Sequence, residues 1–191
     1  MQFEAGNIYH IYNRSNNNQI VFLKHDHYIF FLRKIRKEWI PFFDILAYCL
    51  MPTHFHFMVK VKDIQEVEKI NYAIGKLLSS YTRAINNENH SHGSLFQQKT
   101  KSKCLHEGSD IKKYTTITNY FLHCFNYIHT NPLKDKLVSD LKDWTYSSYP
   151  DYAELRNGTL CNILFAQELL EFKSAKDFIQ FTKHKNIGYA M

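Results

Sequence analysis

Alternating apolar and polar positions predict the strands of this chain. Residues 7–14 alternate in this way, and the polar run 15–19 that follows has the composition of a turn. Residues 42–50 are mostly apolar and predict a largely buried strand. A further strand starts at His54 after a tight three-residue connection, so we expect these two strands to pair as a hairpin. Residues 94–105 again have β character.

Apolar residues at helical spacing predict three longer helices. The first spans residues 25–39 and should end before Pro41, because proline cannot continue a helix. The second spans residues 64–86 and ends in a polar loop. The third starts near residue 116 and runs to residue 130, where we expect Pro132 to stop it.

The order strand, helix, strand, strand, helix, strand predicts the fold class. It is the order of the split βαβ, ferredoxin-like unit, an α+β fold. We therefore expect a four-stranded antiparallel sheet with two helices on one face and the other face open, plus an added C-terminal helix. The strand that starts at His54 should be a central strand. We expect residues 1–152 to form this domain and residues 153–191 a C-terminal helical extension on it or trailing it.

Two histidines, His54 and His56, stand one residue apart on the predicted central strand. Side chains alternate faces along a strand, so both imidazoles share one face and the phenylalanines between and after them share the other. A neutral imidazole pair can bind a divalent metal and leave coordination positions open for a substrate. The alternative is a polar strand face that happens to carry two histidines.

A second group of polar side chains lies on the third helix. Residues four apart share a helix face, so His123, Tyr127 and Asn131 form a row. Tyr127 would then present a phenolic oxygen beside an amide that can bind the same metal. A tyrosine on an amphipathic helix is otherwise an ordinary core or boundary residue. Tyr114 and Tyr120 are rival tyrosines on this stretch, but neither has an amide four residues on.

Composition favours a globular protein with a polyanionic partner. Hydrophobic residues make up 45% and charged residues 22%, and the formal net charge is +6. No apolar run approaches the roughly 20 residues of a membrane span, and residues 1–6 do not have the pattern of a secretion signal. The four cysteines form no Cys-x-x-Cys pair, so we expect reduced thiols in a cytoplasmic protein without a structural zinc site.

Six ordered segments together resemble the single-tyrosine HUH transposases, of the REP-associated tyrosine transposase type. They cover about residues 8–152 and are Tyr9-His10-Ile11-Tyr12-Asn13-Arg14, Ala47-Tyr48-Cys49-Leu50-Met51-Pro52-Thr53-His54-Phe55-His56, Tyr81-Thr82-Arg83-Ala84-Ile85-Asn86 with Gly93-Ser94-Leu95-Phe96-Gln97, Tyr127-Ile128-His129-Thr130-Asn131-Pro132, and Trp144-Thr145-Tyr146-Ser147-Ser148-Tyr149. Each motif alone is weak, and the joint match is specific.

The resemblance implies a site and a reaction. His54 and His56 would bind one divalent ion, Mg²⁺ or Mn²⁺, with Asn131 as a third ligand where some relatives carry Gln. Tyr127 would attack a phosphodiester in hairpin-forming single-stranded DNA and give a 5′-phosphotyrosine link and a free 3′-hydroxyl. A phenol has a pKa near 10, so a nearby cation or base must assist the attack at neutral pH. The reaction is a transesterification and consumes no ATP.

DNA contacts follow from positive charges. The candidates for phosphate binding are Arg14, Lys99, Lys101, Lys103, Lys112 and Lys113. The three lysines of residues 99–103 alternate, so they can share one face of a strand, where protection of a sheet edge is an equal alternative. The amphipathic segments 163–172 and 178–181 can cap the core or contact a DNA hairpin.

Some positions depart from the family pattern and some alternatives stay open. Position 15 is Ser where relatives often carry Gly. Residues 131–138 differ from the commoner Asn-Pro-Val-Arg-Ala-Gly-Leu-Val, and loss of its Gly is expected to alter the C-terminal turn of the helix. The alternatives to a strand transferase are a non-catalytic or domesticated DNA-binding protein of the same fold and a metal-binding regulator. The protein could be a monomer, or a homodimer with the tyrosine helix exchanged.

Overall fold

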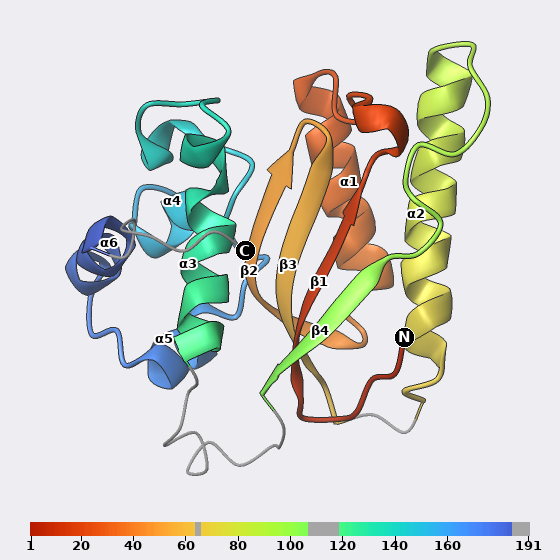
Figure 1. The fold of residues 1–191 in the computed structure, drawn as a ribbon. Helices are drawn as coiled ribbons and strands as arrows, with labels where there is room; N and C mark the ends of the chain where they lie inside the picture. The colour runs from red at the N-terminus through yellow and green to blue at the C-terminus, as the bar shows by residue number, and fades with distance from the viewer. Residues whose placement is uncertain (64–65, 107–118, 185–191) are drawn as a thin grey trace.

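A four-stranded antiparallel sheet forms the centre of the molecule, in strand order β2-β3-β1-β4 (Figure 1). The structure is a computed structural model that describes residues 1–63, 66–106 and 119–184. The strands are β1 (Ile8–Arg14), β2 (Phe43–Met51), β3 (His54–Val61) and β4 (Lys101–His106), and the longer helices are α1 (His25–Glu38), α2 (Lys69–Glu88) and α3 (Asn119–Lys134). The predicted α+β, ferredoxin-like fold class is confirmed.

The strand that carries the two histidines is central, as predicted. β3 lies between β2 and β1 and pairs antiparallel with both. Met51 faces His54 across the predicted hairpin between β2 and β3. On the other side of β3, Tyr12 faces His56 and Arg14 faces His54. Four side chains from two strands therefore meet at one end of the sheet.

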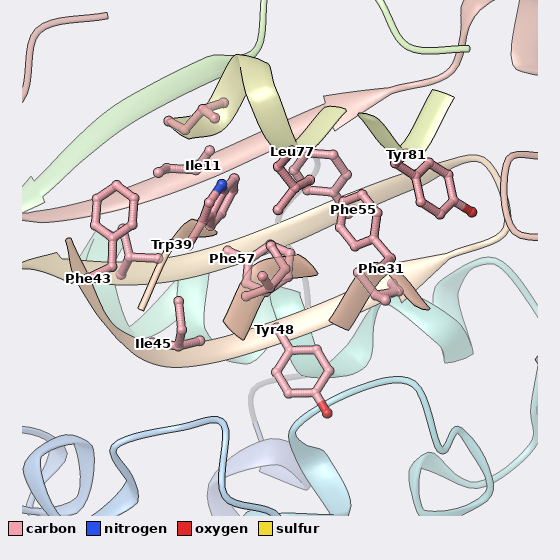
Figure 2. Close-up of a cluster of buried hydrophobic side chains, with 14 of the residues drawn as sticks. Ile11, Phe31, Trp39, Phe43, Ile45, Tyr48, Phe55, Phe57, Leu77 and Tyr81 are labelled. Atoms are coloured by element: carbon pink, nitrogen blue, oxygen red, sulfur yellow. The ribbon is translucent and has the colours of Figure 1, made fainter. Parts of the chain in front are cut away.

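Helices α1 and α2 cover one face of the sheet and enclose an aromatic core (Figure 2). Phe55 and Phe57 of β3 point into it and are completely buried, beside Phe31 of α1, Trp39 just after α1 and Tyr81 of α2. Burial of each such side chain contributes about 1.5–3 kcal/mol to folding. Because Phe55 and Phe57 are held on this face, His54 and His56 must face the opposite side.

The opposite face of the sheet is not open, contrary to our expectation. Helix α3 packs across it from the same chain, on the side away from α1 and α2 (Figure 1). A second buried cluster fills this layer and includes Ala47, Cys49 and Met58 from the sheet, Phe121, Cys124, Phe125 and Ile128 from α3, and Phe178 from the C-terminal helix α6 (Ala175–His184). The reason lies in β2, whose residues on this face are also apolar and need a cover.

One buried histidine ties α3 to the sheet. The Nδ1 of His129 lies 3.0 Å from the carbonyl oxygen of Phe125, and its Nε2 lies 2.8 Å from the Ser148 hydroxyl. The same Ser148 oxygen accepts a 2.9 Å hydrogen bond from the backbone N–H of Tyr48 in β2. This chain of polar contacts orients the face of α3 that carries Tyr127.

Pro132 does not stop α3, contrary to our prediction. It lies in the last turn, and the helix continues to Lys134. The turn closes with hydrogen bonds from the Leu137 N–H to the Pro132 carbonyl (2.9 Å) and from the Lys136 N–H to the Leu133 carbonyl (3.0 Å). Lys136, in the Gly position of the family pattern, has φ 56°. This is a Schellman ending, so the turn that loss of Gly was expected to alter is retained with a lysine.

Two further boundaries differ from the predictions. β4 starts at Lys101 rather than residue 94, because the amide of Asn13 binds the Gln97 carbonyl (3.1 Å) and the Thr100 hydroxyl (2.9 Å) in place of regular strand pairing. Helix α2 starts at Lys69, and the predicted start at residue 64 lies outside the described residues. Ser15, in the other Gly position of the family pattern, has φ −66°, which any residue adopts.

Short helices after residue 148 complete the second layer. They are α4 (Tyr149–Tyr152), α5 (Ile163–Leu170) and α6 (Ala175–His184). Phe178 of α6 is buried against Phe125 of α3, with ring centroids 6.2 Å apart. Of the two alternatives for the amphipathic C-terminal segments, the structure therefore supports capping of the core. Along the described ranges, none of the helices has the length and apolar character of a membrane span.

Candidate functional site

A pocket of about 220 Å³ lies where β1 and β3 pass beneath α3. Its lining residues are Tyr12, Asn13, Arg14, His54, His56, Gln97, Lys99, Lys101 and Tyr127. The structure thus brings together the histidine pair, the tyrosine and three of the positive side chains singled out from the sequence. Tyr12, Asn13 and Gln97 are additional lining residues that sequence reasoning missed.

The two imidazoles lie side by side at this pocket. The ring centroids of His54 and His56 are 5.1 Å apart with the planes nearly perpendicular. The Nδ1 of His54 lies 3.0 Å from the Thr53 hydroxyl. Burial lowers the pKa of both side chains, against a smaller opposing effect of Asp135 on the pKa of His54. Both imidazoles are therefore neutral at pH 7, the form that binds a metal.

His56 is held by a third histidine, His10 of β1. The Nε2 of His10 lies 2.9 Å from the Nδ1 of His56, and both rings are buried. Burial, together with the charge of Lys103, lowers the pKa of His10 to about 4. The other ring nitrogen of His56, Nε2, is buried and has no hydrogen-bond partner within the described part of the chain.

Tyr127 of α3 faces the histidine pair. Its ring lies edge-on to His56, with centroids 5.1 Å apart and the planes at 80°. The ammonium of Lys134, two turns along the helix, lies 4.7 Å from the centre of the Tyr127 ring. Burial raises the pKa of Tyr127, and Asn131 acts in the opposite direction. The phenol is therefore protonated at neutral pH unless a positive charge is added beside it.

Asn131 lies one helical turn from Tyr127, and only 3% of its surface is exposed. Its side chain raises the pKa of His54 and lowers that of Tyr127, so it lies next to both. Its amide nitrogen has no partner of good hydrogen-bond geometry among the described residues. Rotation of the amide exchanges its nitrogen and oxygen, so either atom can be turned toward the histidines.

These groups fit a divalent metal ion that accepts both nitrogen and oxygen ligands. The buried Nε2 of His56 has no partner among the described residues, and a cation would satisfy its lone pair. The amide nitrogen of Asn131 also has no partner in the described part of the chain, and turning the amide would put its oxygen, which can bind a cation, in that place. In the three described ranges, no cluster of three or more His, Cys, Asp or Glu forms a fuller site. A metal here would thus have two imidazoles and one amide oxygen from the chain, which leaves positions for substrate oxygens.

The remaining predicted site residues divide into two groups. Lys103 does not line the pocket, and its ammonium lies 3.8 Å above the ring of Tyr120. Tyr120, one rival nucleophile, does not line the pocket either. Lys112 and Lys113, and the other rival Tyr114, lie outside the described residues.

A larger groove adjoins the pocket. It has a volume of about 1260 Å³ and lies between α2 and residues 91–100. Gln97 and Lys99 line both the groove and the pocket. Arg83 and Lys99 supply positive charge, and no acidic side chain is among its described lining residues. The groove therefore forms a positively charged extension of the pocket along α2.

His10 is the main site residue that sequence reasoning missed. Alternation along β1 places it on the face of Tyr12 and Arg14, toward the histidine pair. That signal was present in the sequence, but the contact with His56 depends on the register between β1 and β3, in which His10 faces Met58 and lies diagonal to His56.

Comparison with known proteins supports the family resemblance. No family model matches the chain. A protein of Haemophilus influenzae named as a REP-associated tyrosine transposase is 24% identical in an alignment that covers 56% of this chain. The alignment spans 59% of that relative's length. A solved structure of a REP-associated tyrosine transposase bound to a REP hairpin superposes with a TM-score of 0.57 at 17% identity, over 85% of this chain and 87% of the other. The resemblance to this family is confirmed, by sequence in the first case and by fold in the second.

Proposed function

We propose that this chain cleaves and rejoins single-stranded DNA at hairpin-forming sites through a covalent tyrosine intermediate. The observation that carries the proposal is the position of Tyr127, edge-on to His56 in a pocket that Arg14, Lys99 and Lys101 also line. A DNA hairpin as the substrate is supported by the similar protein that was solved bound to one. The coarser function, a DNA-binding transposase-type protein, has the same support from the named relative.

The cleavage step is a transesterification at phosphorus. The hydroxyl oxygen of Tyr127 forms a bond to the phosphorus while the bond from phosphorus to the 3′-oxygen breaks. The phenol loses a proton and the departing 3′-oxygen gains one, so the step is neutral in protons and electrons. The products are a 5′-phosphotyrosine and a 3′-hydroxyl. Attack of a 3′-hydroxyl on the phosphotyrosine reverses the step and joins strands.

His54, His56 and Asn131 would hold the divalent ion, Mg²⁺ or Mn²⁺. When bound, the ion supplies positive charge that stabilises the phosphate oxygens and favours ionisation of the phenol. Asn131 favours ionisation further, since its contact lowers the pKa of Tyr127. Lys134 adds a cation 4.7 Å from the ring centre. These effects oppose the burial that otherwise raises the pKa of the nucleophile.

Positive side chains would hold the DNA backbone. Arg14, Lys99 and Lys101 converge on the pocket and can bind the phosphates that flank the reacting one. The adjoining groove along α2 gives a single strand a path away from the pocket, because Gln97 and Lys99 are common to both. Its amide side chains, among them Asn87 and Gln98, can bind base edges.

The test is covalent adduct formation. The protein is incubated with hairpin-containing single-stranded DNA of varied sequence and Mg²⁺ or Mn²⁺, and the mixture is denatured and separated by electrophoresis. We expect a denaturant-resistant protein–DNA band with the wild type and with Tyr120→Phe, and none with Tyr127→Phe. Tyr120→Phe is the matched control, because this tyrosine lies on the same helix but outside the pocket.

Two results would count against the proposal. An undiminished band from Tyr127→Phe would mean that another residue is the nucleophile. Tight hairpin binding without any band, across the range of hairpins and both metals, would instead support the alternative of a non-catalytic DNA-binding protein.

A further inference from the structure

The contact between His10 and His56 constrains the protons of both rings. The two nitrogens, Nε2 of His10 and Nδ1 of His56, are 2.9 Å apart, the length of a hydrogen bond. A hydrogen bond between two imidazole nitrogens needs one N–H and one lone pair. The proton lies therefore either on His56, which then donates to His10, or on His10, which then donates to His56.

These two arrangements leave the far side of His56 in different states. If His56 donates from Nδ1, its Nε2 carries a lone pair. If His56 accepts at Nδ1, its Nε2 carries a hydrogen. This Nε2 is the buried atom for which the described residues provide no partner. Only the first arrangement presents the metal with an electron pair.

The position of His10 is well defined by its neighbours. Its ring stacks on Tyr12, with centroids 4.7 Å apart and the planes inclined by 25°. It meets His56 edge to edge through the two nitrogens, with centroids 5.1 Å apart and the planes again inclined by 25°. Only 4% of its surface is exposed. The stacking on Tyr12 and the burial of the ring keep the Nε2 of His10 directed at His56 and hinder rotation of the ring away from it.

We infer that His10 is a positioning residue whose Nε2 accepts a hydrogen bond from the Nδ1–H of His56, so that the Nε2 of His56 keeps its lone pair for the metal. The inference rests on the proposed function only in that it requires a metal at His54 and His56. A histidine ligand commonly donates its other N–H to a partner that fixes the tautomer and the ring orientation. Here the partner is a neutral imidazole from the neighbouring strand, in place of the more usual carboxylate or carbonyl.

A purely structural role for His10 makes a different prediction. In that case the ring serves only to fill space beside Tyr12, and a phenylalanine in its place would preserve the packing and the metal site together. The positioning role requires an acceptor at this place, so phenylalanine should fail and a side chain with an acceptor oxygen should partly succeed.

The first test is the tautomer of His56 in the metal-free wild type. Long-range proton–nitrogen NMR correlations of ¹⁵N-histidine protein distinguish the two forms, and the His56→Gln variant assigns the signal. We expect His56 to carry its proton on Nδ1. A proton on Nε2 of His56 would overturn the inference without the need for any variant of His10.

The second test is the affinity for Mn²⁺ alone, measured from the electron paramagnetic resonance signal of the free ion. His10→Phe removes the acceptor and keeps an aromatic ring, and we expect it to weaken Mn²⁺ binding about 10- to 100-fold. His10→Gln restores an acceptor oxygen and should recover part of the affinity. Met58→Leu, at the buried position opposite His10 on β3, is the matched packing control and should bind Mn²⁺ as the wild type does.

The outcomes separate this inference from the proposed function. Wild-type Mn²⁺ affinity in a folded His10→Phe variant would contradict the role of His10, whether or not the protein acts on DNA. Conversely, a His56 proton on Nδ1 with weakened Mn²⁺ binding in His10→Phe would uphold that role even if no DNA adduct ever forms. The far-ultraviolet circular dichroism of each variant shows that it is folded.

Discussion

The ring of Tyr127 lies edge-on to the imidazole of His56, with the two centroids 5.1 Å apart. One residue comes from the helix that covers the sheet and the other from a central strand, so the pocket depends on the docking of α3. His129 secures that docking through Ser148 and the backbone of Tyr48. Stability of the second layer and geometry of the site are therefore linked.

Divalent metal should stabilise the folded protein. A ligand that binds only the folded state adds about 2.7 kcal/mol at a concentration 100 times its dissociation constant. We expect saturating Mn²⁺ to raise the melting temperature of the wild type by several degrees and to leave that of His54→Ala and His56→Ala almost unchanged. Differential scanning fluorimetry with and without EDTA measures the effect. An equal rise in the alanine variants would place the metal elsewhere on the protein.

Acid should destabilise the metal-free protein in part through His129. Burial lowers the pKa of His129 to about 3, whereas an unfolded histidine has a pKa near 6.5. Only the unfolded state gains this proton between those values, so stability is complete above pH 6.5 and falls as the pH decreases toward 3. The loss from this one group is of the order of 1.4 kcal/mol per pH unit.

Urea unfolding between pH 7 and 5 tests that assignment. His129→Gln should unfold at lower urea concentrations than the wild type at pH 7 but show a shallower dependence on pH. Ser148→Ala removes the hydrogen-bond partner and keeps the titrating ring, so it should retain the steep dependence. An unchanged slope in His129→Gln would mean that other groups cause the acid sensitivity.

Lys136→Gly should stabilise the protein. Lys136 has φ 56° at the end of α3, a conformation that glycine adopts without steric cost. We expect a gain of about 0.5–1 kcal/mol in the free energy of unfolding, measured by urea denaturation. As the control, Lys37→Gly within α1 should lower it, because glycine is unfavourable inside a helix. A loss of stability in Lys136→Gly would contradict the αL assignment.

DNA binding should depend on salt through the three positive residues of the pocket. Each of Arg14→Ala, Lys99→Ala and Lys101→Ala should weaken binding to a single-stranded hairpin and reduce the slope of log affinity against log salt by about 0.7–0.9. Lys37→Ala changes a lysine of α1, on the other face of the sheet, and should leave the slope unchanged. Fluorescence anisotropy at several salt concentrations gives the slopes. If all four variants kept the wild-type slope, phosphate contacts at the pocket would be excluded.

Much of the fold could be predicted because β3 has a clear apolar face and the two long helices that follow the strands are amphipathic. Alternation in β3 placed Phe55 and Phe57 in the core and both histidines on the far side, as the structure has them. The pattern of β3 could not show that a helix covers the face of the sheet that carries the histidines. The evidence for that cover lies in β2, where the residues of both faces are apolar and buried. Patterns within one segment do not show which later helix provides the cover.

The site was predicted from residue types, and what was missed depends on register. The spacing of four residues was enough to predict that Tyr127 and Asn131 share one face of a helix. The contact of His10 with His56 and the place of Tyr12 opposite His56 follow only from how β1 pairs with β3. The prediction that Pro132 stops α3 failed for a different reason. A proline in the last turn of a helix removes few hydrogen bonds, because the turn that follows satisfies the terminal carbonyls.

The most direct measurement of the central claim is the identity of the residue that becomes linked to DNA. The protein is allowed to react with a single-stranded hairpin and Mn²⁺, the adduct is digested with nuclease and protease, and tandem mass spectrometry locates the remaining nucleotide. We expect a nucleotide joined through a 5′-phosphate to Tyr127. A nucleotide on Tyr120, Tyr12 or any other residue, or no modified peptide from a protein that binds the hairpin and metal, would contradict that expectation.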